Sequence, residues 1–217
     1  MALAIFDLDN TLIAGDSDHA WGEFLIEQGH VDPGSYKRAN DTFYQDYLRG
    51  ELDIYAYQRF ALEPLTRFTP EQLNQLHQQF MALKIKPIML PKAAELLAKH
   101  RQAGDFLLII TATNRFVTGP IAELLGVDDI LATEPEQHDG CYTGNLVGTP
   151  CYQAGKVVRL NQWLETNAFD LKGSYFYSDS RNDIPLLERV DHPVAVDADQ
   201  VLSEHAQALG WSHISLR

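Results

Sequence analysis

The stretch Leu3–Leu12 constrains the fold of this chain more than any other part of the sequence. A short apolar run, Leu3 to Phe6, is typical of a strand buried in a parallel sheet. It ends abruptly at Asp7 and Asp9, and the Asn and Thr that follow favour a turn. Because open α/β folds place their chemistry at the carboxyl ends of central strands, we expect the two carboxylates to mark a functional site.

Asp7 and Asp9 leave the predicted strand on one side of the chain, close enough to share a cation. Two such carboxylates repel each other unless positive charge lies between them. Mg²⁺, which prefers oxygen ligands and water, is the natural candidate. An ordinary acidic turn explains a bare Asp-x-Asp pair at least as well, so the interpretation depends on the rest of the chain.

A chain of 217 residues with 45% apolar and 22% charged residues has the composition of a globular protein with a sizeable core. Its formal net charge of −13 disfavours nucleic acid and anionic membranes as partners. We find neither a signal peptide nor an apolar run long enough to span a bilayer, and we expect a cytoplasmic location. Cys141 and Cys151 are then expected to be reduced thiols.

Residues 15–86 have a helical pattern throughout, with no evident strand. The start signals of four successive helices are Ser17, Asp32-Pro33, Asp53 and a capping box at Thr69–Gln72. Aromatic residues are dense in the middle of this block: Tyr36, Phe43, Tyr44, Tyr47, Tyr55, Tyr57 and Phe60. We expect most of them to pack helix against helix and a minority to line a binding pocket.

From residue 87 onward, strands and helices alternate. The predicted strands cover residues 106–110, 130–132, 175–177 and 193–196, and a hairpin with its turn at Asp139-Gly140 is predicted for residues 136–150. The alternation predicts an α/β fold with a doubly wound, Rossmann-like parallel sheet. Residues 1–14 and 87–217 form the predicted core, and residues 15–86 form an all-helical insertion between its first two strands.

Polar groups also follow later elements of the predicted core. Thr111 ends the second strand, where a hydroxyl followed by small residues at a helix start can hold a phosphate. Lys156 begins the helix after the hairpin, and Asp179 and Asp183 follow strand 175–177. A helix cap for Thr111 and a solvated side chain for Lys156 are the ordinary alternatives when each residue is considered alone.

Together these elements resemble the motifs of the haloacid-dehalogenase-like (HAD) phosphatases, and they occur in the family's order. The matching residues are Asp7 with Asp9, Thr111, Lys156, and Asp179 with Asp183. The helical insertion is similar to the C1-type cap that subfamily I carries between its first and second motifs. Within that subfamily the chain resembles the phosphoserine-phosphatase-like group IB, and it looks closest to the histidinol-phosphate phosphatases.

The resemblance implies an enzyme that hydrolyses phosphomonoesters through an aspartyl-phosphate on Asp7, with Asp9 as general acid and base. It implies Mg²⁺ held by Asp7, the Asp9 carbonyl and Asp179, with Asp183 orienting the ligands. A non-catalytic scaffold should have lost one of these groups, and a dehalogenase needs no acid at Asp9. Transfer of the phosphoryl group to an acceptor other than water remains a less favoured alternative.

The same resemblance assigns phosphate contacts to Thr111, the Ala112 amide, Lys156 and Asn182. A cap that closes over the site favours a small phosphomonoester as substrate. Phosphoserine phosphatases bind the substrate amine with an acidic residue that corresponds here to Asp16, for which a solvated helix-start carboxylate is the alternative.

Their carboxylate-binding arginine corresponds to Ala61, and the neighbouring Arg59 points elsewhere on a helix. The expected substrate is therefore a phosphorylated amino alcohol such as histidinol phosphate, with O-phosphoserine as the alternative.

Overall fold

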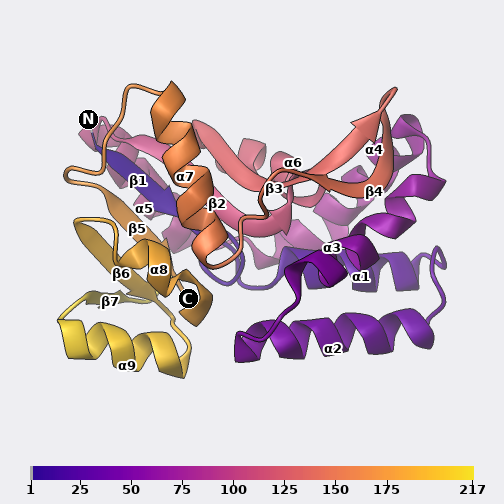
Figure 1. Cartoon of the computed structure of the whole chain (residues 1–217), viewed down its shortest axis with the longest axis horizontal. Coiled ribbons are helices and arrows are strands. Elements are labelled where there is room, and N and C mark those ends of the chain that lie inside the picture. Colours follow the sequence, from indigo (N-terminus) through magenta and orange to yellow (C-terminus); the bar gives the residue numbers. More distant parts are fainter. Residues whose placement is uncertain (1) are drawn as a thin grey trace.

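The computed structural model describes residues 2–217, so Met1 of the predicted core range lies outside the described residues. Within them, seven strands form one sheet in the order β4-β3-β2-β1-β5-β6-β7. β1 (Leu3–Phe6) lies at its centre, parallel to β2 (Phe106–Asn114) and β5 (Tyr175–Ser178) (Figure 1). The outer strands are β3 (Asp129–His138), β4 (Cys141–Val147), β6 (His192–Val196) and β7 (Ser212–Ile214). Only the β3–β4 pair is antiparallel among these strands, which confirms the doubly wound α/β fold.

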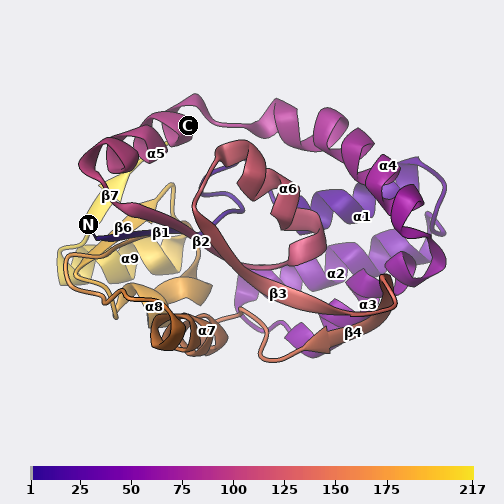
Figure 2. The same cartoon turned by 90° about the horizontal axis from the view of Figure 1, so that it is seen from above.

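Alternate residues of β1 face two separate apolar layers, as expected of a strand covered on both sides. Ala4 and Phe6 face one layer, whereas Leu3 and Ile5 face the other, and all four side chains are fully buried. The first layer includes α5 (Pro91–Ala103) and α6 (Arg115–Leu125), and the second includes α7 (Ala154–Thr166), α8 (Ile184–Leu187) and α9 (Gln200–Leu209). Figure 2 shows the sheet between α5 and α6 on one side and α7 and α8 on the other.

The predicted helical insertion, residues 15–86, contains no named strand and is drawn in purple tones in Figure 1. Its α-helices are α1 (Ser17–Glu27), α2 (Ser35–Arg49), α3 (Ile54–Leu62) and α4 (Pro70–Phe80). A short 3-10 helix, η1 (Glu63–Arg67), lies between α3 and α4, and a π-helical turn, η2 (Met81–Ile85), and a second 3-10 helix, η3 (Lys86–Ile88), follow α4, so the last helical turn passes the predicted boundary. Within residues 2–217, no helix is both long enough and apolar enough to cross a membrane.

The predicted starts of α3 and α4 are confirmed, whereas those of α1 and α2 are displaced. α2 begins at Ser35 after Gly34, so Pro33 precedes the helix and does not lie in its first turn. Asp53 caps α3, and Thr69 forms a capping box with Gln72 at α4. The prediction that Ser17 caps α1 is wrong, because Asp16 accepts the His19 amide at 2.8 Å instead. The amide of Ser17, the first residue of α1, donates to the carboxylate of Asp9. The helix cap is therefore one residue earlier than predicted, at Asp16.

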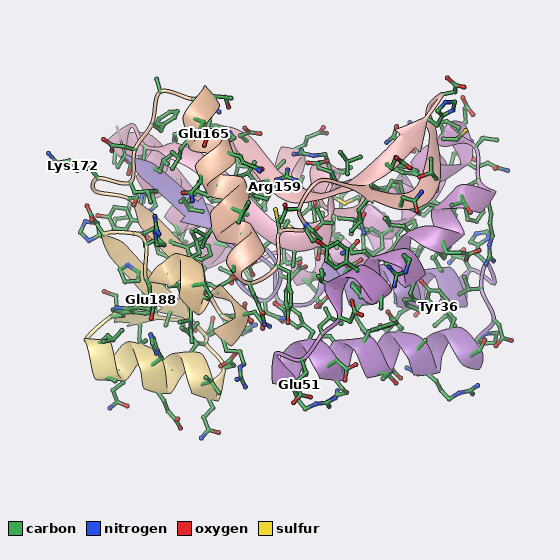
Figure 3. The ribbon with its side chains drawn as sticks, viewed as in Figure 1. Tyr36, Glu51, Arg159, Glu165, Lys172 and Glu188 are labelled. Atoms are coloured by element: carbon green, nitrogen blue, oxygen red, sulfur yellow. The ribbon has the colours of Figure 1, made fainter. Side chains whose placement is uncertain are left out.

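The predicted hairpin turn at Asp139-Gly140 is confirmed, with both residues in the left-handed region. β3 is longer than predicted and includes the separately predicted strand 130–132, whereas β4 ends at Val147, before the predicted end of the hairpin at residue 150. β4 packs against α3 and η1 of the helical insertion. Arg159 reaches from α7 toward this side of the sheet (Figure 3), where it contacts Glu134 of β3 at 3.5 Å. The hairpin therefore joins the core to the insertion.

Trp21 of α1 fixes the insertion to the core through aromatic contacts. Its ring lies 5.1 Å from the ring of Phe80 on α4 and 5.1 Å from that of Phe116 on α6. The side chain is 1% exposed, and its indole N–H has no hydrogen-bond partner among the described residues. Its contribution therefore comes from ring packing rather than from hydrogen bonding.

Trp21→Ala should lower the free energy of unfolding by about 3–5 kcal/mol, because it leaves a large cavity between insertion and core. Trp21→Phe should cost much less, since the unpaired indole N–H contributes no hydrogen bond. Leu48→Ala, at a side chain that is 48% exposed, is the control and should change stability by at most about 0.5 kcal/mol. Denaturant unfolding measures all three, and a loss below about 1 kcal/mol for Trp21→Ala would contradict this role.

Candidate active site

Asp7 and Asp9 leave the carboxyl end of β1 into a tight turn. The Asp7 amide still donates to the carbonyl of Tyr177 on β5, at 2.9 Å, so Asp7 keeps its place in the sheet. Asn10 then adopts a left-handed backbone with φ of 56°, which asparagine tolerates better than most residues. Both carboxylates are buried, with exposed fractions of 3% for Asp7 and 9% for Asp9.

Asp9 accepts hydrogen bonds from two other elements. Its Oδ2 accepts the hydroxyl groups of Thr113 at 2.9 Å and Thr111 at 3.3 Å, both on β2. Its Oδ1 accepts the amide of Ser17 at 2.6 Å, at the start of α1. The carboxylate therefore ties β1 to its neighbouring strand and to the first helix of the insertion.

Lys156 lies at the centre of the buried charges. Its Nζ donates to Asp7 Oδ1 at 2.7 Å and to Asp183 Oδ2 at 2.8 Å, and its side chain is 3% exposed. The preceding Gly155 allows this placement, because a Cβ there would lie 2.1 Å from the carbonyl oxygen of Pro150. A larger residue at 155 would therefore push the start of α7 away from Asp7.

Asp179 and Asp183 follow β5, which pairs with β1 on the side opposite β2. The Thr11 hydroxyl donates to Asp179 Oδ1 at 3.2 Å, and the Asp179 amide donates to Thr11 Oγ1 at 3.1 Å. The Ser178 hydroxyl donates to Asp183 Oδ2 at 2.7 Å. The two parallel strands thus bring all four predicted acidic residues to one edge of the sheet.

These carboxylates outnumber the positive charge that contacts them. Burial raises the pKa of Asp7 to about 8, with Asp183 and Asp9 adding to the increase and Lys156 opposing it. Burial, followed by Asp7 and Asp183, also raises the pKa of Asp179 well above its usual range. Burial alone would lower the pKa of Lys156, but Asp183 and Asp7 raise it above its usual range. One ammonium shared between two carboxylates leaves the site with excess negative charge.

The predicted phosphate-binding residues divide into two groups. Thr111 lies within β2, which continues to Asn114 because Thr is well suited to a strand and Asn114 pairs with Thr133 of β3. Thr111 and Ala112 line the same cavity as Asp7. Asn182 instead donates to the Tyr47 carbonyl of α2 at 3.1 Å, which joins the core to the insertion.

A cavity extends from Asp7 and Asp9 to Asp16 and the helices of the insertion. Of the seven aromatic residues in the middle of the helical insertion, four line this cavity: Phe43, Tyr44, Tyr47 and Tyr57. This is more than the minority expected from the sequence. Among the described residues that line it there is no lysine or arginine. The cavity is thus acidic and aromatic.

The sequence reasoning missed four polar residues of this cavity, namely Asp18, His19, Asn40 and Thr113. Two of them carry a local signal. Thr113 follows Thr111 by two residues on a strand, so both face the same side. Asp18 lies in the first turn of the helix that Asp16 caps. Asn40, on α2, carries no such signal, because only helix packing brings it to α1.

Residues 4–188 match the family model of the haloacid dehalogenase-like hydrolases. The chain belongs to this family. It is 46% identical to a histidinol-phosphatase of Neisseria meningitidis, with 99% of each chain covered, and 31% identical to the phosphoserine phosphatase SerB1 of Mycobacterium tuberculosis, with 97% of this chain and 69% of that protein covered. The HAD-like chain described here is accordingly a phosphatase.

Two solved structures have the same fold as this chain. A protein with unknown function from Bordetella pertussis Tohama I superposes with a TM-score of 0.93 at 45% identity, over 100% of this chain and 99% of that one. A substrate-bound phosphoserine phosphatase superposes with a TM-score of 0.73 at 18% identity, over 98% and 92% of the two chains. The second likeness concerns the fold alone.

The charge of Asp16 should make stability depend on pH. Burial, together with Asp9, raises the pKa of Asp16 from 3.8 to about 7, although the His19 amide opposes the increase. Between about pH 4 and pH 7 the unfolded chain releases this proton while the folded chain keeps it, so stability falls as pH rises through this range. Asn removes this charge and still caps α1.

In the presence of a chelator, the melting temperature of Asp16→Asn should therefore be about 2–4 °C above that of wild type at pH 8. A change of roughly 1 kcal/mol in the free energy of unfolding produces such a shift in a chain of this size. The difference should close as the pH falls toward 4. Thermal unfolding at several pH values measures it. A difference that is independent of pH, or a wild-type protein that is the more stable at pH 8, would count against a raised pKa at Asp16.

Proposed function

We propose that this phosphatase is a Mg²⁺-dependent hydrolase of a small phosphorylated amino alcohol, most specifically histidinol phosphate, acting through an aspartyl-phosphate. The observation that carries the substrate proposal is the acidic, aromatic cavity beside Asp7, which no lysine or arginine among the described residues lines. The Neisseria relative named histidinol-phosphatase, which matches almost the whole chain, supports the same substrate.

In the proposed reaction, a carboxylate oxygen of Asp7 attacks phosphorus and the bond to the substrate alkoxide breaks. The contact of Lys156 with Asp7 supports this role, because the ammonium favours the ionised nucleophile. The same ammonium offsets negative charge as the phosphoryl group is transferred. Asp183 contributes by fixing Lys156 from the other side.

Asp9 is proposed to protonate the leaving alkoxide and then to take a proton from the water that hydrolyses the aspartyl-phosphate. The two carboxylates lie in unequal environments. Asp9 is held by the Thr113 hydroxyl and the Ser17 amide, whereas Asp7 contacts an ammonium. Two carboxylates in unequal environments can carry unequal protonation, as acid and nucleophile require.

The residues fit a Mg²⁺ ion because oxygen donors with uncompensated negative charge gather at one edge of the sheet. Asp7, the Asp9 carbonyl and Asp179 would hold the ion, and Asp183 would orient them. Within residues 2–217 no group of three His, Cys, Asp or Glu side chains is arranged to hold a metal by itself, so the proposed site combines side chains with a backbone carbonyl. When bound, the ion supplies positive charge that neutralises the phosphoryl oxygens.

The Thr111 hydroxyl and the Ala112 amide are proposed to bind the other phosphoryl oxygens. Both residues line the cavity, and the Ala112 peptide is fixed by the Thr133 hydroxyl, which donates to its carbonyl at 2.8 Å. The helical insertion, residues 15–86, is proposed as a cap that excludes bulk water. Asn182, in contact with Tyr47 of that cap, is better placed to steady its closed position than to touch phosphate.

Asp16 is proposed to bind the substrate ammonium, as its position in the cavity supports. The position expected for a carboxylate-binding arginine is Ala61, which is buried, and the neighbouring Arg59 is exposed and outside the cavity. A substrate carboxylate would therefore be buried without a positive partner, at a considerable cost in free energy. This disfavours O-phosphoserine and favours an amino alcohol.

The test is phosphate release from histidinol phosphate and from O-phosphoserine, each with Mg²⁺ and with a chelator. We expect kcat/KM to be at least about 100-fold higher for histidinol phosphate, since an unpaired buried charge costs several kcal/mol. The chelator should abolish turnover of both. Asp16→Asn should lose activity on amine-bearing substrates but much less on p-nitrophenyl phosphate.

O-Phosphoserine turned over as well as histidinol phosphate would overturn the substrate proposal and favour a phosphoserine phosphatase. Full activity after exhaustive chelation would remove Mg²⁺ from the mechanism.

A further inference from the structure

Asp18 is a buried carboxylate that the proposed reaction does not use. It lies in the first turn of α1, lines the cavity and is 6% exposed. Its partners are neutral, since the Tyr57 hydroxyl donates to it and the Asn114 amide lies 3.4 Å away. Burial raises the pKa of Asp18 well above its usual range, with Asp16 and Asp9 adding to the increase. Such a carboxyl group becomes ionised in the folded protein only when a cation, such as one from a ligand, lies beside it.

Asn40 provides a second acceptor in the same cavity. Its side-chain nitrogen donates to the His19 carbonyl at 3.1 Å, and because a carbonyl only accepts, this contact fixes the orientation of the amide. No hydrogen bond to the Asn40 oxygen is formed among the described residues, and this oxygen is not one of their fully buried unpaired atoms, so it is open to the cavity that Asn40 lines. An amide oxygen that is open to the cavity can accept a hydrogen bond from a donor on a ligand.

Gly22 on α1 makes room for the Asn40 amide. A Cβ at position 22 would lie 2.6 Å from Asn40 Nδ2, closer than two such atoms can approach. The side chain of Asn40 therefore packs flat against the backbone of α1, beside the turn that carries Asp18. The close packing of α1 and α2 at Gly22 thus positions the Asn40 side chain in the cavity wall.

Aromatic rings form another part of this cavity. Phe43 and Tyr57 pack edge to face with ring centres 5.3 Å apart, and Tyr44 lies 4.8 Å from the His19 ring. Such faces suit a flat, positively charged ring through stacking and cation–π contacts. The cavity therefore combines two hydrogen-bond acceptors, Asp18 and Asn40, with aromatic walls that suit a planar group.

We propose that Asp18 and Asn40 form a subsite for the imidazole ring of the substrate, each accepting one of the two N–H groups of an imidazolium. This inference rests on the proposed function and extends it, because Asp16 accounts for the ammonium and leaves the ring unassigned. Asp18 and Asn40 are specificity-determining residues, remote from the phosphorus. Two acidic contacts, Asp16 and Asp18, then match the two cationic groups of one substrate.

The first test compares two substrates that share the phosphate and the ammonium but differ in the ring, histidinol phosphate and O-phosphoethanolamine. Asp18→Asn keeps the shape of the side chain and removes its charge. It should lower kcat/KM for histidinol phosphate by about 10–100-fold, mainly through KM, and change that for O-phosphoethanolamine by less than about 3-fold. Glu23→Gln, on the same helix outside this cavity, is the matched control and should alter neither.

The outcomes distinguish a failure of the Asp18–Asn40 subsite from a failure of the proposed substrate. A wild-type enzyme without preference for histidinol phosphate over O-phosphoethanolamine contradicts the proposed substrate and the subsite together. A wild-type preference that survives in Asp18→Asn contradicts the subsite alone. Equal losses on both substrates also contradict it, because they assign Asp18 a structural role through Tyr57 and Asn114.

A measurement on the wild-type protein avoids any dependence on the folding of a variant. NMR titration of isotope-labelled histidinol bound with Mg²⁺ and inorganic phosphate should show a ring pKa above that of free histidinol. The charged or titratable side chains that line the cavity around the ring are Asp7, Asp9, Asp16, Asp18, His19, Tyr44, Tyr47 and Tyr57. A ring pKa that is unchanged or lowered on binding would overturn the subsite.

Discussion

The hydrogen bonds from Lys156 to Asp7 and Asp183 are the interaction on which the rest of the site depends. Three segments far apart in sequence meet at this buried ammonium, because β1 and β5 are parallel neighbours and α7 begins beside them. A buried charge without a partner would be strongly destabilising, so each of the three groups requires the others. The site is therefore part of what holds the carboxyl edge of the sheet together.

Much of this arrangement could be predicted from the sequence because strand ends carry strong local signals. The apolar runs before Asp7 and Asp179 are short, buried and followed at once by polar residues, and parallel strands place their carboxyl ends at one edge. Lys156 was predictable only through the family resemblance, since a single lysine at a helix start has no signal of its own. The hairpin turn at Asp139-Gly140 was evident from its residue types alone.

The remaining features depend on tertiary packing. β7 has three residues, too few for a periodic pattern, and β2 continues beyond Thr111 because β3 offers a partner at Asn114. Asp16 caps α1 in place of Ser17 because Asp9, eight residues earlier, takes the Ser17 amide. Asn40 enters the cavity because Gly22 lets two helices approach closely, which no local pattern predicts. The core was thus easier to predict than the side of the helical insertion that lines the cavity.

The central claim is that Asp7, neutralised by Lys156, becomes covalently phosphorylated, and trapping the intermediate tests it most directly. Enzyme mixed with histidinol phosphate and Mg²⁺ can be quenched in acid and treated with borohydride, which reduces an aspartyl-phosphate to homoserine, before peptide mass mapping. The account predicts homoserine at position 7, with Asp9 unmodified. Modification at Asp9 instead, or none at either residue under conditions of rapid turnover, would contradict it.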